Sequence, residues 1–404
     1  MVPAKLVAAN GMSILVINTG STSLKFGVFD AGARGLMASG SIDWSQGDRR
    51  YAKLQVRNTD GTELRSFAAV PNDFAAAKCA IHAVAGQTEI GAVGHRVVHG
   101  GNEFKGSVWV DQRVKGAIDR LAELAPLHNP PALAAIEAVE SSLPGTPQVA
   151  VFDTAFFSGL PPRAFMYPVP YDWYEQWGVR RMGFHGISNT YCLQRAAELL
   201  GSTAAPPRLI TCHLGGGCSV TAVKAGQPGS TTMGFTPLEG LMMGTRCGSI
   251  DPGILIYLQR NHGMDVESLD LALHHRSGLL GISGVSAIFS QVEAAAQDGN
   301  ERARLALEMF ADRVREAIGG LAVRMGGVGA LVFTGRIGGS SPGLRTAVCE
   351  GLECLGLQLD PDENAKCQPD ADIASKGSQG RILAIQTNEE LVIARETRRV
   401  TRGG

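Results

Sequence analysis

Apolar and polar residues alternate in short blocks along the first part of the chain. Residues 14–17 are aliphatic and mostly β-branched, which predicts a buried strand, and residues 26–29 predict a second strand. The segment between them, Asn18-Thr-Gly-Ser-Thr-Ser-Leu-Lys25, predicts a turn. Its N–H and hydroxyl groups can surround a phosphate, Lys25 can add a positive charge, and Asn18 can hold a hydrated Mg²⁺. An ordinary polar hairpin explains this segment equally well.

The blocks that follow predict helices and strands of an α/β protein. Further strands are expected within residues 40–56 and a helix within residues 74–84. Apolar residues three and four apart predict a helix over residues 114–124, which the prolines of residues 125–131 end. Pro131 then starts another helix, which runs to about residue 139. Residues 148–152 predict a buried strand with Asp153 at its carboxyl end.

The second half of the chain repeats the opening pattern. Strands are expected at residues 209–213 and 220–223, joined by a glycine-rich turn. A long helix over residues 302–325 precedes a strand at 330–333 and a third small-residue turn over 334–341. A strand at residues 382–386 and a helix at 389–398 complete the pattern. The repetition predicts two domains of one plan, with residues 1–11 and 401–404 as loose ends.

Composition narrows the class of protein. The 404 residues are enough for two domains, and a net charge of −1 argues against nucleic acid as a partner. The eight cysteines form no C-x-x-C pair, and no signal peptide precedes them, which predicts reduced thiols in a cytoplasmic protein. No apolar run is long enough to cross a membrane, so no membrane association is expected.

Several charged and polar residues are candidates for chemistry. Arg96 and Arg246 lie among apolar residues and glycines, so each is expected to bind a phosphate or carboxylate. The alternative is that each pairs with a structural carboxylate. Asp153 has the position of a site carboxylate in an open α/β sheet, and His185 and His213 lie beside glycines. No zinc-binding cluster is present, and no G-x-S-x-G nucleophile elbow is expected.

Longer segments carry a resemblance to a known family. They comprise residues 16–25, 95–101, 124–130, 152–156, 183–186, 233–246 and 387–395. These segments resemble the acetokinase family, within the superfamily of sugar kinases, Hsp70 and actin. The resemblance implies an α/β fold of two duplicated ribonuclease H-like domains, of the actin and Hsp70 type, with an interdomain cleft. Residues 1–154 plus 388–404 would form the N-terminal domain on the acyl and metal side, and residues 155–387 the nucleotide-binding domain.

The resemblance also implies the activity, which is reversible phosphoryl transfer between ATP and acetate to give ADP and acetyl phosphate. The cofactor would be Mg²⁺ or Mn²⁺, and the enzyme a cytoplasmic homodimer. A carboxylate is already ionised at neutral pH, so catalysis requires alignment and charge neutralisation, without a strong base. Asp153 would then orient the metal or an arginine.

Site residues follow from the same resemblance. The metal positions match Asn18 and Glu389, the carboxylate-binding arginine matches Arg96, and the catalytic group matches Asp153, His185 and Arg246. The residues around the acetate methyl group match Val98, Leu127, Phe184 and Pro237. The nucleotide positions match Lys25, His213, Leu214, Gly215, Gly216, Gly217, Arg336, Ile337, Gly338, Gly339 and Ser340.

The departures from the family pattern lie mainly on the nucleotide side. Gly216 stands where the family usually has Asn, and Gly335-Arg-Ile-Gly-Gly-Ser340 where it has Gly-Gly-Ile-Gly-Glu-Asn. Ile288-Phe-Ser290 replaces an Asp-x-Arg beside the adenosine. Alternatives are therefore a propionate kinase, an acetate kinase with another phosphoryl donor such as a different nucleotide or pyrophosphate, and a non-catalytic ligand-binding relative. The retained acyl and phosphoryl residues argue against the last.

Overall fold

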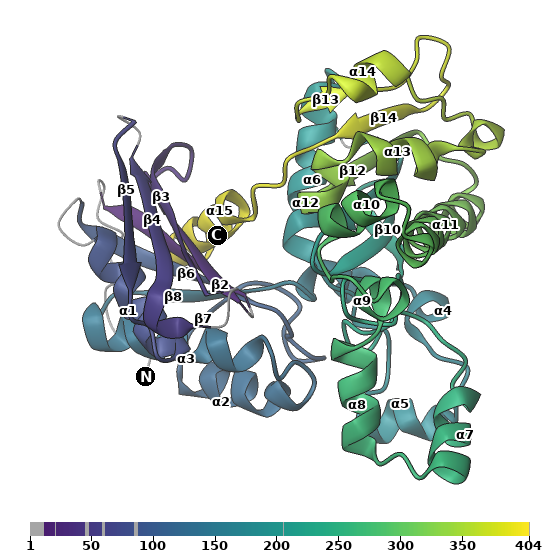
Figure 1. Ribbon diagram of the computed structural model, residues 1–404. Helices are drawn as coiled ribbons and strands as arrows, with labels where there is room; N and C mark the ends of the chain where they lie inside the picture. Colours follow the sequence, from purple (N-terminus) through teal and green to yellow (C-terminus); the bar gives the residue numbers. More distant parts are fainter. Residues whose placement is uncertain are drawn as a thin grey trace. The chain divides into compact units, whose positions relative to one another are not determined.

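The computed structural model describes residues 12–20, 22–44, 48–58, 61–84, 88–204 and 206–403. The chain divides into two compact units, an N-terminal unit of residues 1–158 with 388–404 and a C-terminal unit of residues 159–387 (Figure 1). The expectation of a loose end at residues 1–11 lies outside the described residues. Within the described part of the chain, none of the helices combines the length and apolar character that crossing a membrane requires.

The N-terminal unit is built on an eight-stranded sheet in the order β5-β4-β3-β2-β1-β6-β8-β7. The strands β1 to β3, β6 and β8 form its centre, with β1 parallel to β6 and β6 parallel to β8. Its strands are β1 (Ser13–Thr19), β2 (Ser23–Phe29), β3 (Leu36–Asp43), β4 (Ala52–Asn58), β5 (Glu63–Ala68), β6 (Ile90–Val97), β7 (Val108–Trp109) and β8 (Gln148–Phe152). Its helices are α1 (Asp73–Val84), α2 (Gln112–Arg120), α3 (Asn129–Ser142) and α15 (Glu389–Thr401), with 3-10 turns at Arg49–Tyr51, Leu121–Glu123 and Ala155–Gly159.

The C-terminal unit has a six-stranded sheet in the order β11-β10-β9-β12-β14-β13. Its strands are β9 (Arg208–Leu214), β10 (Cys218–Lys224), β11 (Gln227–Thr231), β12 (Ala330–Thr334), β13 (Ala371–Asp372) and β14 (Arg381–Ala384). Its helices are α4 (Pro162–Phe165), α5 (Tyr171–Trp177), α6 (Gly186–Leu199), α7 (Gly253–His262), α8 (Val266–His275), α9 (Gly278–Ser283), α10 (Phe289–Gln297), α11 (Glu301–Met325), α12 (Gly335–Ser340), α13 (Pro342–Cys349) and α14 (Pro361–Ala365), with a 3-10 turn at Leu352–Leu355.

The two sheets share one topology. In each, three consecutive antiparallel strands are followed by two parallel ones, in the order β3-β2-β1-β6-β8 and β11-β10-β9-β12-β14. The repeated pattern of the sequence therefore reflects a duplicated fold, as predicted. The turn between β1 and β2 and the turn between β9 and β10 occupy equivalent positions in the two copies.

In each copy, the helix that follows the parallel strands in sequence packs against the other sheet. Helix α6 follows β8 in sequence but packs against β9 and β12, whereas α15 follows β14 and packs against β1, β6 and β8 (Figure 1). The N-terminal unit is therefore completed only by the last residues of the chain.

Both faces of the central N-terminal strands are covered, which explains their continuous apolar runs. All seven residues of β1 are buried. In β6, Val93 belongs to the core that includes residues of α1 and α3, while Gly94 faces α15, because successive residues of a strand point to opposite faces. A Cβ at Gly94 would overlap the Thr397 side chain and lie 2.8 Å from Ile393 Cγ2. Glycine at this position lets α15 approach the sheet closely.

Two predicted turns differ from the structure. The turn expected over residues 18–25 is shorter, because Asn18 and Lys25 already pair in register across β1 and β2. The third small-residue turn, expected over residues 334–341, is wrong, since residues 335–340 form helix α12. Gly335 begins this helix at φ +80°, and a Cβ there would lie 2.5 Å from the Leu214 carbonyl oxygen. Arg345 donates to the carbonyl oxygens of residues 338 and 339, both at 2.9 Å, and fixes the helix.

The substitution Gly94→Ala is expected to lower the free energy of unfolding by about 1–3 kcal/mol, because the added methyl group overpacks the contact with α15. Urea unfolding measures the change. The same substitution at Gly116, a half-buried residue of α2, is the matched control, because an added Cβ there has only the Arg120 guanidinium within 4 Å. Gly116→Ala is expected to leave stability unchanged or raise it. Equal effects of the two substitutions would contradict the packing argument.

Candidate active site

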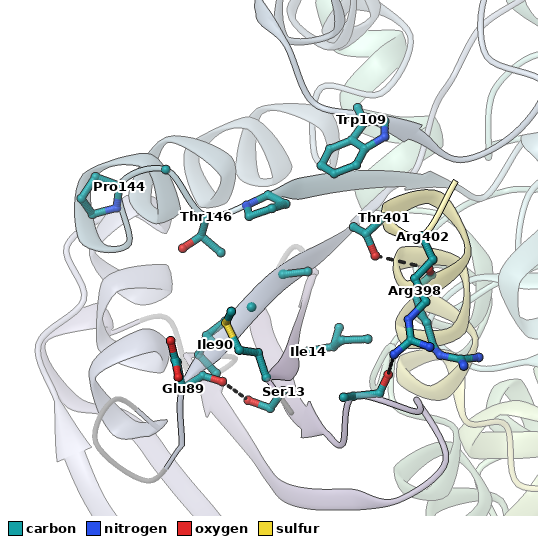
Figure 2. A pocket seen from close by; sticks show the side chains of 16 residues that line it. Ser13, Ile14, Glu89, Ile90, Trp109, Pro144, Thr146, Arg398, Thr401 and Arg402 are labelled. Atoms are coloured by element: carbon teal, nitrogen blue, oxygen red, sulfur yellow. Dashed lines mark hydrogen bonds between the residues drawn. The ribbon is translucent and has the colours of Figure 1, made fainter. Parts of the chain in front are cut away.

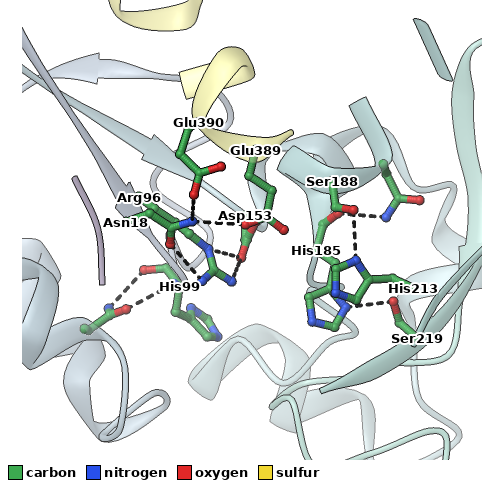
Figure 3. A network of polar contacts seen from close by, with 12 residues as sticks. Asn18, Arg96, His99, Asp153, His185, Ser188, His213, Ser219, Glu389 and Glu390 are labelled. Atoms are coloured by element: carbon green, nitrogen blue, oxygen red, sulfur yellow. Dashed lines mark hydrogen bonds and ion pairs between the residues drawn. The ribbon is translucent and has the colours of Figure 1, made fainter. Parts of the chain in front are cut away.

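The N-terminal cluster, defined as Asn18, Arg96, Asp153, Glu389 and Glu390, lies at the carboxyl ends of the parallel strands (Figure 3). Asn18 is near the end of β1, Arg96 near the end of β6, and Asp153 directly after β8. Helix α15 begins with the two glutamates. Parallel strands bring their carboxyl ends to one edge of the sheet, which is where open α/β sheets bind ligands.

Arg96 is the centre of this cluster. Its Nε and Nη2 donate to Asp153 Oδ2 at 2.9 and 2.6 Å, and its Nη1 donates to Asn18 Oδ1 at 3.3 Å. The Asn18 amide nitrogen donates to Glu389 Oε2 and Glu390 Oε1, both at 3.2 Å. Burial opposes the charge on Arg96, but Asp153 and the two glutamates outweigh it and hold its pKa above the ordinary value. The structure therefore shows the alternative in which Arg96 pairs with a carboxylate. That carboxylate belongs to Asp153, which is itself a predicted site residue.

The chemistry of this cluster suits a hard divalent cation. Three carboxylates surround one guanidinium, and the donors are carboxylate and amide oxygens, which Mg²⁺ and Mn²⁺ prefer. Among the residues that the structure describes, no group of three or more His, Cys, Asp and Glu side chains is arranged to hold a metal ion. Mg²⁺ does not require such a group, because it is usually held by one or two carboxylates, waters and substrate phosphates.

Other predicted residues of the N-terminal unit lie around this cluster. Lys25 lines a small pocket of about 180 Å³ together with Asn388 and Glu390. Val98 is buried, whereas Leu127 is 39% exposed. The structure therefore gives Leu127 no buried apolar environment within its own unit.

The C-terminal unit contains a histidine pair, His185 and His213, whose rings stack with centroids 4.1 Å apart and planes 17° apart. A serine hydroxyl contacts Nδ1 of each ring, Ser219 on His185 at 2.9 Å and Ser188 on His213 at 2.8 Å (Figure 3). A hydroxyl that donates to Nδ1 places the proton of the neutral ring on Nε2. The serines thus orient both rings, and in the tautomer in which Ser219 donates to Nδ1, His185 can donate through Nε2.

The backbone of His185 is also held in an uncommon conformation. Its φ of 62° is left-handed, and it directly precedes helix α6. The backbone N–H and the side-chain amide of Asn189 both donate to the His185 carbonyl oxygen at 2.9 Å. A Cβ at residue 217 would lie 3.2 Å from His185 Nε2, so Gly217 leaves room beside the ring. Strained non-glycine backbone supported in this way is typical of functional sites.

Arg246 differs from Arg96 in having no carboxylate partner among the described residues. Its Nη1 donates to the Pro237 carbonyl oxygen at 3.2 Å and lies 3.9 Å from Met243 Sδ. Burial lowers its pKa, with only a weak opposing effect of Cys218. A largely buried guanidinium without a carboxylate is prepared to bind an anion from outside the protein.

A second network holds the loop that carries Pro237. Arg181 donates to the carbonyl oxygens of residues 232 and 233 at 2.9 and 3.1 Å, and to Glu239 Oε1 at 2.7 Å. The Tyr167 hydroxyl donates to Glu239 and accepts the N–H of Phe235 at 2.8 Å. This loop is therefore fixed partly by Arg181 and Tyr167, which lie outside the segments that carry the family resemblance.

The predicted nucleotide residues form two adjacent segments of the C-terminal unit. His213 and Leu214 end β9, Gly215 donates its N–H to the Gly217 carbonyl oxygen at 3.1 Å, and residues 336–340 belong to α12. The segments touch, since a Cβ at Gly215 would lie 3.7 Å from the Arg336 nitrogen. Ile288 and Ser290, at the start of α10, are exposed. Phe184 is buried and Pro237 half-buried in this unit.

Three supporting side chains were not predicted from the sequence: Ser188, Ser219 and Glu390. Ser188 follows His185 by three residues and Glu390 follows a predicted metal ligand, so local spacing could have indicated both. Ser219 lies on β10 and reaches His185 only through the fold.

Comparison with known proteins decides the family. The sequence model of the acetokinase family matches residues 13–395. The chain belongs to the acetokinase family. It is 46% identical over 400 residues to an acetate kinase from Trichormus variabilis, covering 95% of this chain and 98% of that protein.

Solved structures of the acetokinase family have the same fold. An acetate kinase from Porphyromonas gingivalis has a TM-score of 0.86 and 36% identity, covering 96% of this chain and 99% of the other. A propionate kinase from Francisella tularensis has a TM-score of 0.87 and 35% identity, covering 96% of this chain and 100% of the other. The resemblance inferred from motifs is therefore confirmed over nearly the whole chain.

Acid is expected to destabilise the N-terminal unit through His95, the neighbour of Arg96 in β6. His95 is buried, its Nε2 bonds Gln148 Oε1 at 2.7 Å, and its buried Nδ1 has no hydrogen-bond partner among the described residues. Burial lowers the pKa of His95 to about 4, with the Gln148 bond opposing. Between pH 6.5 and 4 the unfolded chain therefore binds a proton that the folded chain does not. The free energy of unfolding has its full value above pH 6.5. It falls by about 1.4 kcal/mol for each pH unit below 6.5, to a total loss of about 3 kcal/mol near pH 4.

Urea unfolding between pH 4.5 and 7.5 measures this slope. His95→Gln, which keeps an N–H donor for Gln148, is expected to reduce it, whereas His262→Gln, at an exposed histidine, is expected to leave it unchanged. The same slope in the parent and in His95→Gln would contradict the assignment.

Proposed function

We propose that the protein catalyses reversible phosphoryl transfer between ATP and acetate, giving ADP and acetyl phosphate. The observation that carries this proposal is the match to the acetokinase family over residues 13–395. Residues of both units serve the reaction, with the N-terminal cluster binding the acid and the metal, and the C-terminal residues binding the nucleotide and the transferring phosphoryl group.

Arg96 binds the carboxylate of the acid in this proposal. A guanidinium has five N–H donors, and Arg96 uses three of them on Asp153 and Asn18, so two remain. The bonds to the buried Asp153 fix the plane of the guanidinium before the substrate arrives. Asp153 thus acts by orienting Arg96, and the ionised acid needs no base.

Arg246 and His185 stabilise the transferring phosphoryl group. The transition state of this reaction is loose and carries charge on its equatorial oxygens, so the main requirement is fixed positive charge and N–H donors. Arg246 supplies a charge that no described carboxylate neutralises, and the contact with Ser219 orients His185 as a donor.

Asn18 and Glu389 would hold the metal, with Glu390 and Asp153 as further carboxylates of the same cluster. When bound, Mg²⁺ or Mn²⁺ neutralises phosphate charge. The cytoplasmic location and the homodimer expected from the sequence belong to this proposal as well.

The acid is acetate in the primary proposal, with Val98, Leu127, Phe184 and Pro237 around its methyl group. Similarity to a propionate kinase supports propionate as the alternative acid. A single methylene in an apolar pocket changes discrimination by only about 1–3 kcal/mol, so both acids are expected to react at different rates.

Arg246→Ala tests the proposal, and the expected loss of kcat is about a hundred- to a thousandfold, because the charge acts on the transition state. A hydroxamate assay of acyl phosphate formation measures it. Arg246 gives a cleaner test than Arg96, whose removal would leave Asp153 buried without its cation. The control is Arg260→Ala, at an exposed arginine of α7. An activity within tenfold of the parent for a folded Arg246→Ala protein would refute the assigned role.

The donor site is expected to bind ATP weakly and to discriminate little between ATP and GTP, because the polar groups of the family are missing at several positions. Gly216 is exposed, and an added Cβ there meets no atom within 4 Å. Gly216→Asn is therefore expected to lower the KM for ATP by about two- to tenfold, which is the change in affinity that one new hydrogen bond typically produces. Gly216→Ala adds the Cβ without the amide and is the matched control. Steady-state kinetics with ATP, GTP and pyrophosphate measure the effect, and a strong preference of the parent for ATP over GTP would contradict the expectation.

A further inference from the structure

A pocket of about 350 Å³ lies in the N-terminal unit at the amino ends of β1 and β6 (Figure 2). Its walls come from the first residues of these strands, the edge strand β7, the loop of residues 144–147 after α3, and the last turns of α15. Its volume lies in the range of pockets that hold small molecules. No predicted site residue lines it.

Two arginines of α15 form one side of this pocket. Arg398 and Arg402 are four residues apart and therefore lie on one face of the helix. Arg402 donates to the Ala31 carbonyl oxygen at 3.3 Å, and Arg398 Nε is buried with no hydrogen-bond partner among the described residues. Neither arginine pairs with a carboxylate in the described part of the chain. Glu89, the acidic residue of the lining, lies on the opposite side in Figure 2.

The rest of the lining is largely apolar and includes a flat ring. Trp109 of β7, 37% exposed, lies at one end of the pocket in Figure 2. Ile14, Ile90 and Pro144 contribute further apolar surface. An aromatic ring packs well against an indole, and a guanidinium pair binds an acid group at the same time.

We propose that this pocket binds a small organic anion, a carboxylate or phosphate carried on a flat aryl or heteroaryl group. The acid group accepts hydrogen bonds from the guanidinium groups of Arg398 and Arg402, and the ring packs against Trp109. The inference rests on the N-terminal unit alone and does not depend on the proposed function.

The pocket is separate from the N-terminal cluster. The cluster occupies the carboxyl ends of β1 and β6, whereas the pocket occupies their amino ends. Along α15, Arg398 lies nine residues beyond Glu389, which is about 14 Å at the rise of an α-helix. A ligand of the pocket therefore does not compete with acetate.

Fluorine NMR titration of the full-length protein tests the proposal, with 4-fluorobenzoate and 4-fluorophenyl phosphate as probes. Saturable binding of one or both acids is expected, and comparison of the two distinguishes a carboxylate from a phosphate preference. The neutral 4-fluorobenzyl alcohol is expected to bind at least about fivefold more weakly, because it lacks the charge-assisted bonds. Absence of binding by both acids, or equal binding of the alcohol, would overturn the proposal.

Three variants that each remove one positive charge from α15 locate the site. Arg398→Gln is expected to weaken binding about tenfold and Arg402→Gln, at an exposed residue, about threefold. Arg399→Gln is the matched control, because Arg399 pairs with Glu396 at 2.8 Å and does not line the pocket. Turnover is expected to remain unchanged in all three. If Arg398→Gln fails to fold, Arg402→Gln carries the test.

A competition experiment separates the pocket from the acid-binding site. Saturating acetate with ATP is expected to leave binding of the fluorinated acid unchanged. Displacement of the probe by acetate, or equal weakening by Arg399→Gln and Arg402→Gln, would show that the probe binds elsewhere.

Discussion

The buried ion pair between Arg96 and Asp153 is the interaction on which the N-terminal cluster depends. Asp153 has no exposed surface, and two N–H groups of Arg96 bind its carboxylate and compensate its buried charge. The pairing requires β6 and β8 to lie parallel and in register, with Arg96 opposite Val151. Arg96 in turn donates to Asn18, which bonds the glutamates of α15. One pair thus connects strand register, the start of a helix and the arginine proposed to bind the acid.

In each unit of the duplicated fold, one helix carries a predicted site residue at its amino end. His185 directly precedes α6, and Glu389 begins α15, so both helices present a functional residue at their first turn. Helix α15 packs on β1, β6 and β8, which are distant in sequence, whereas α6 packs on β12 and on β9, the strand that directly follows it. Gly94 allows α15 to pack closely on β6, because any side chain at residue 94 would push the helix, and Glu389 with it, away from the strand. Close packing of the last helix is therefore a condition for the geometry of the cluster.

Local patterns were enough to predict the strands, the long helices and the place of Asp153. Strands buried on both faces consist of continuous apolar residues, and the end of such a run marks the end of the strand. The resemblance to the family named the site residues. The sequence did not predict that residues 335–340 form a helix, since its stability comes from Arg345 and from the space beside Leu214. Nor did it reveal Ser219 or the pocket beside Trp109, which arise from residues brought together only by folding.

Positions of the proposed site differ in how much a substitution there would disturb the interior of the protein. Arg96 is bound to a buried carboxylate, so substitution of either partner leaves an uncompensated charge inside the unit. Positions that depart from the family pattern are of another kind. Gly216 and Ile288 are exposed, and a Cβ at Gly339 would meet only Pro369, at 3.8 Å. Substitution there alters contacts with a ligand without disturbing the core. By this difference in structural cost, substitutions are tolerated more easily at the proposed nucleotide positions than at Arg96 and Asp153.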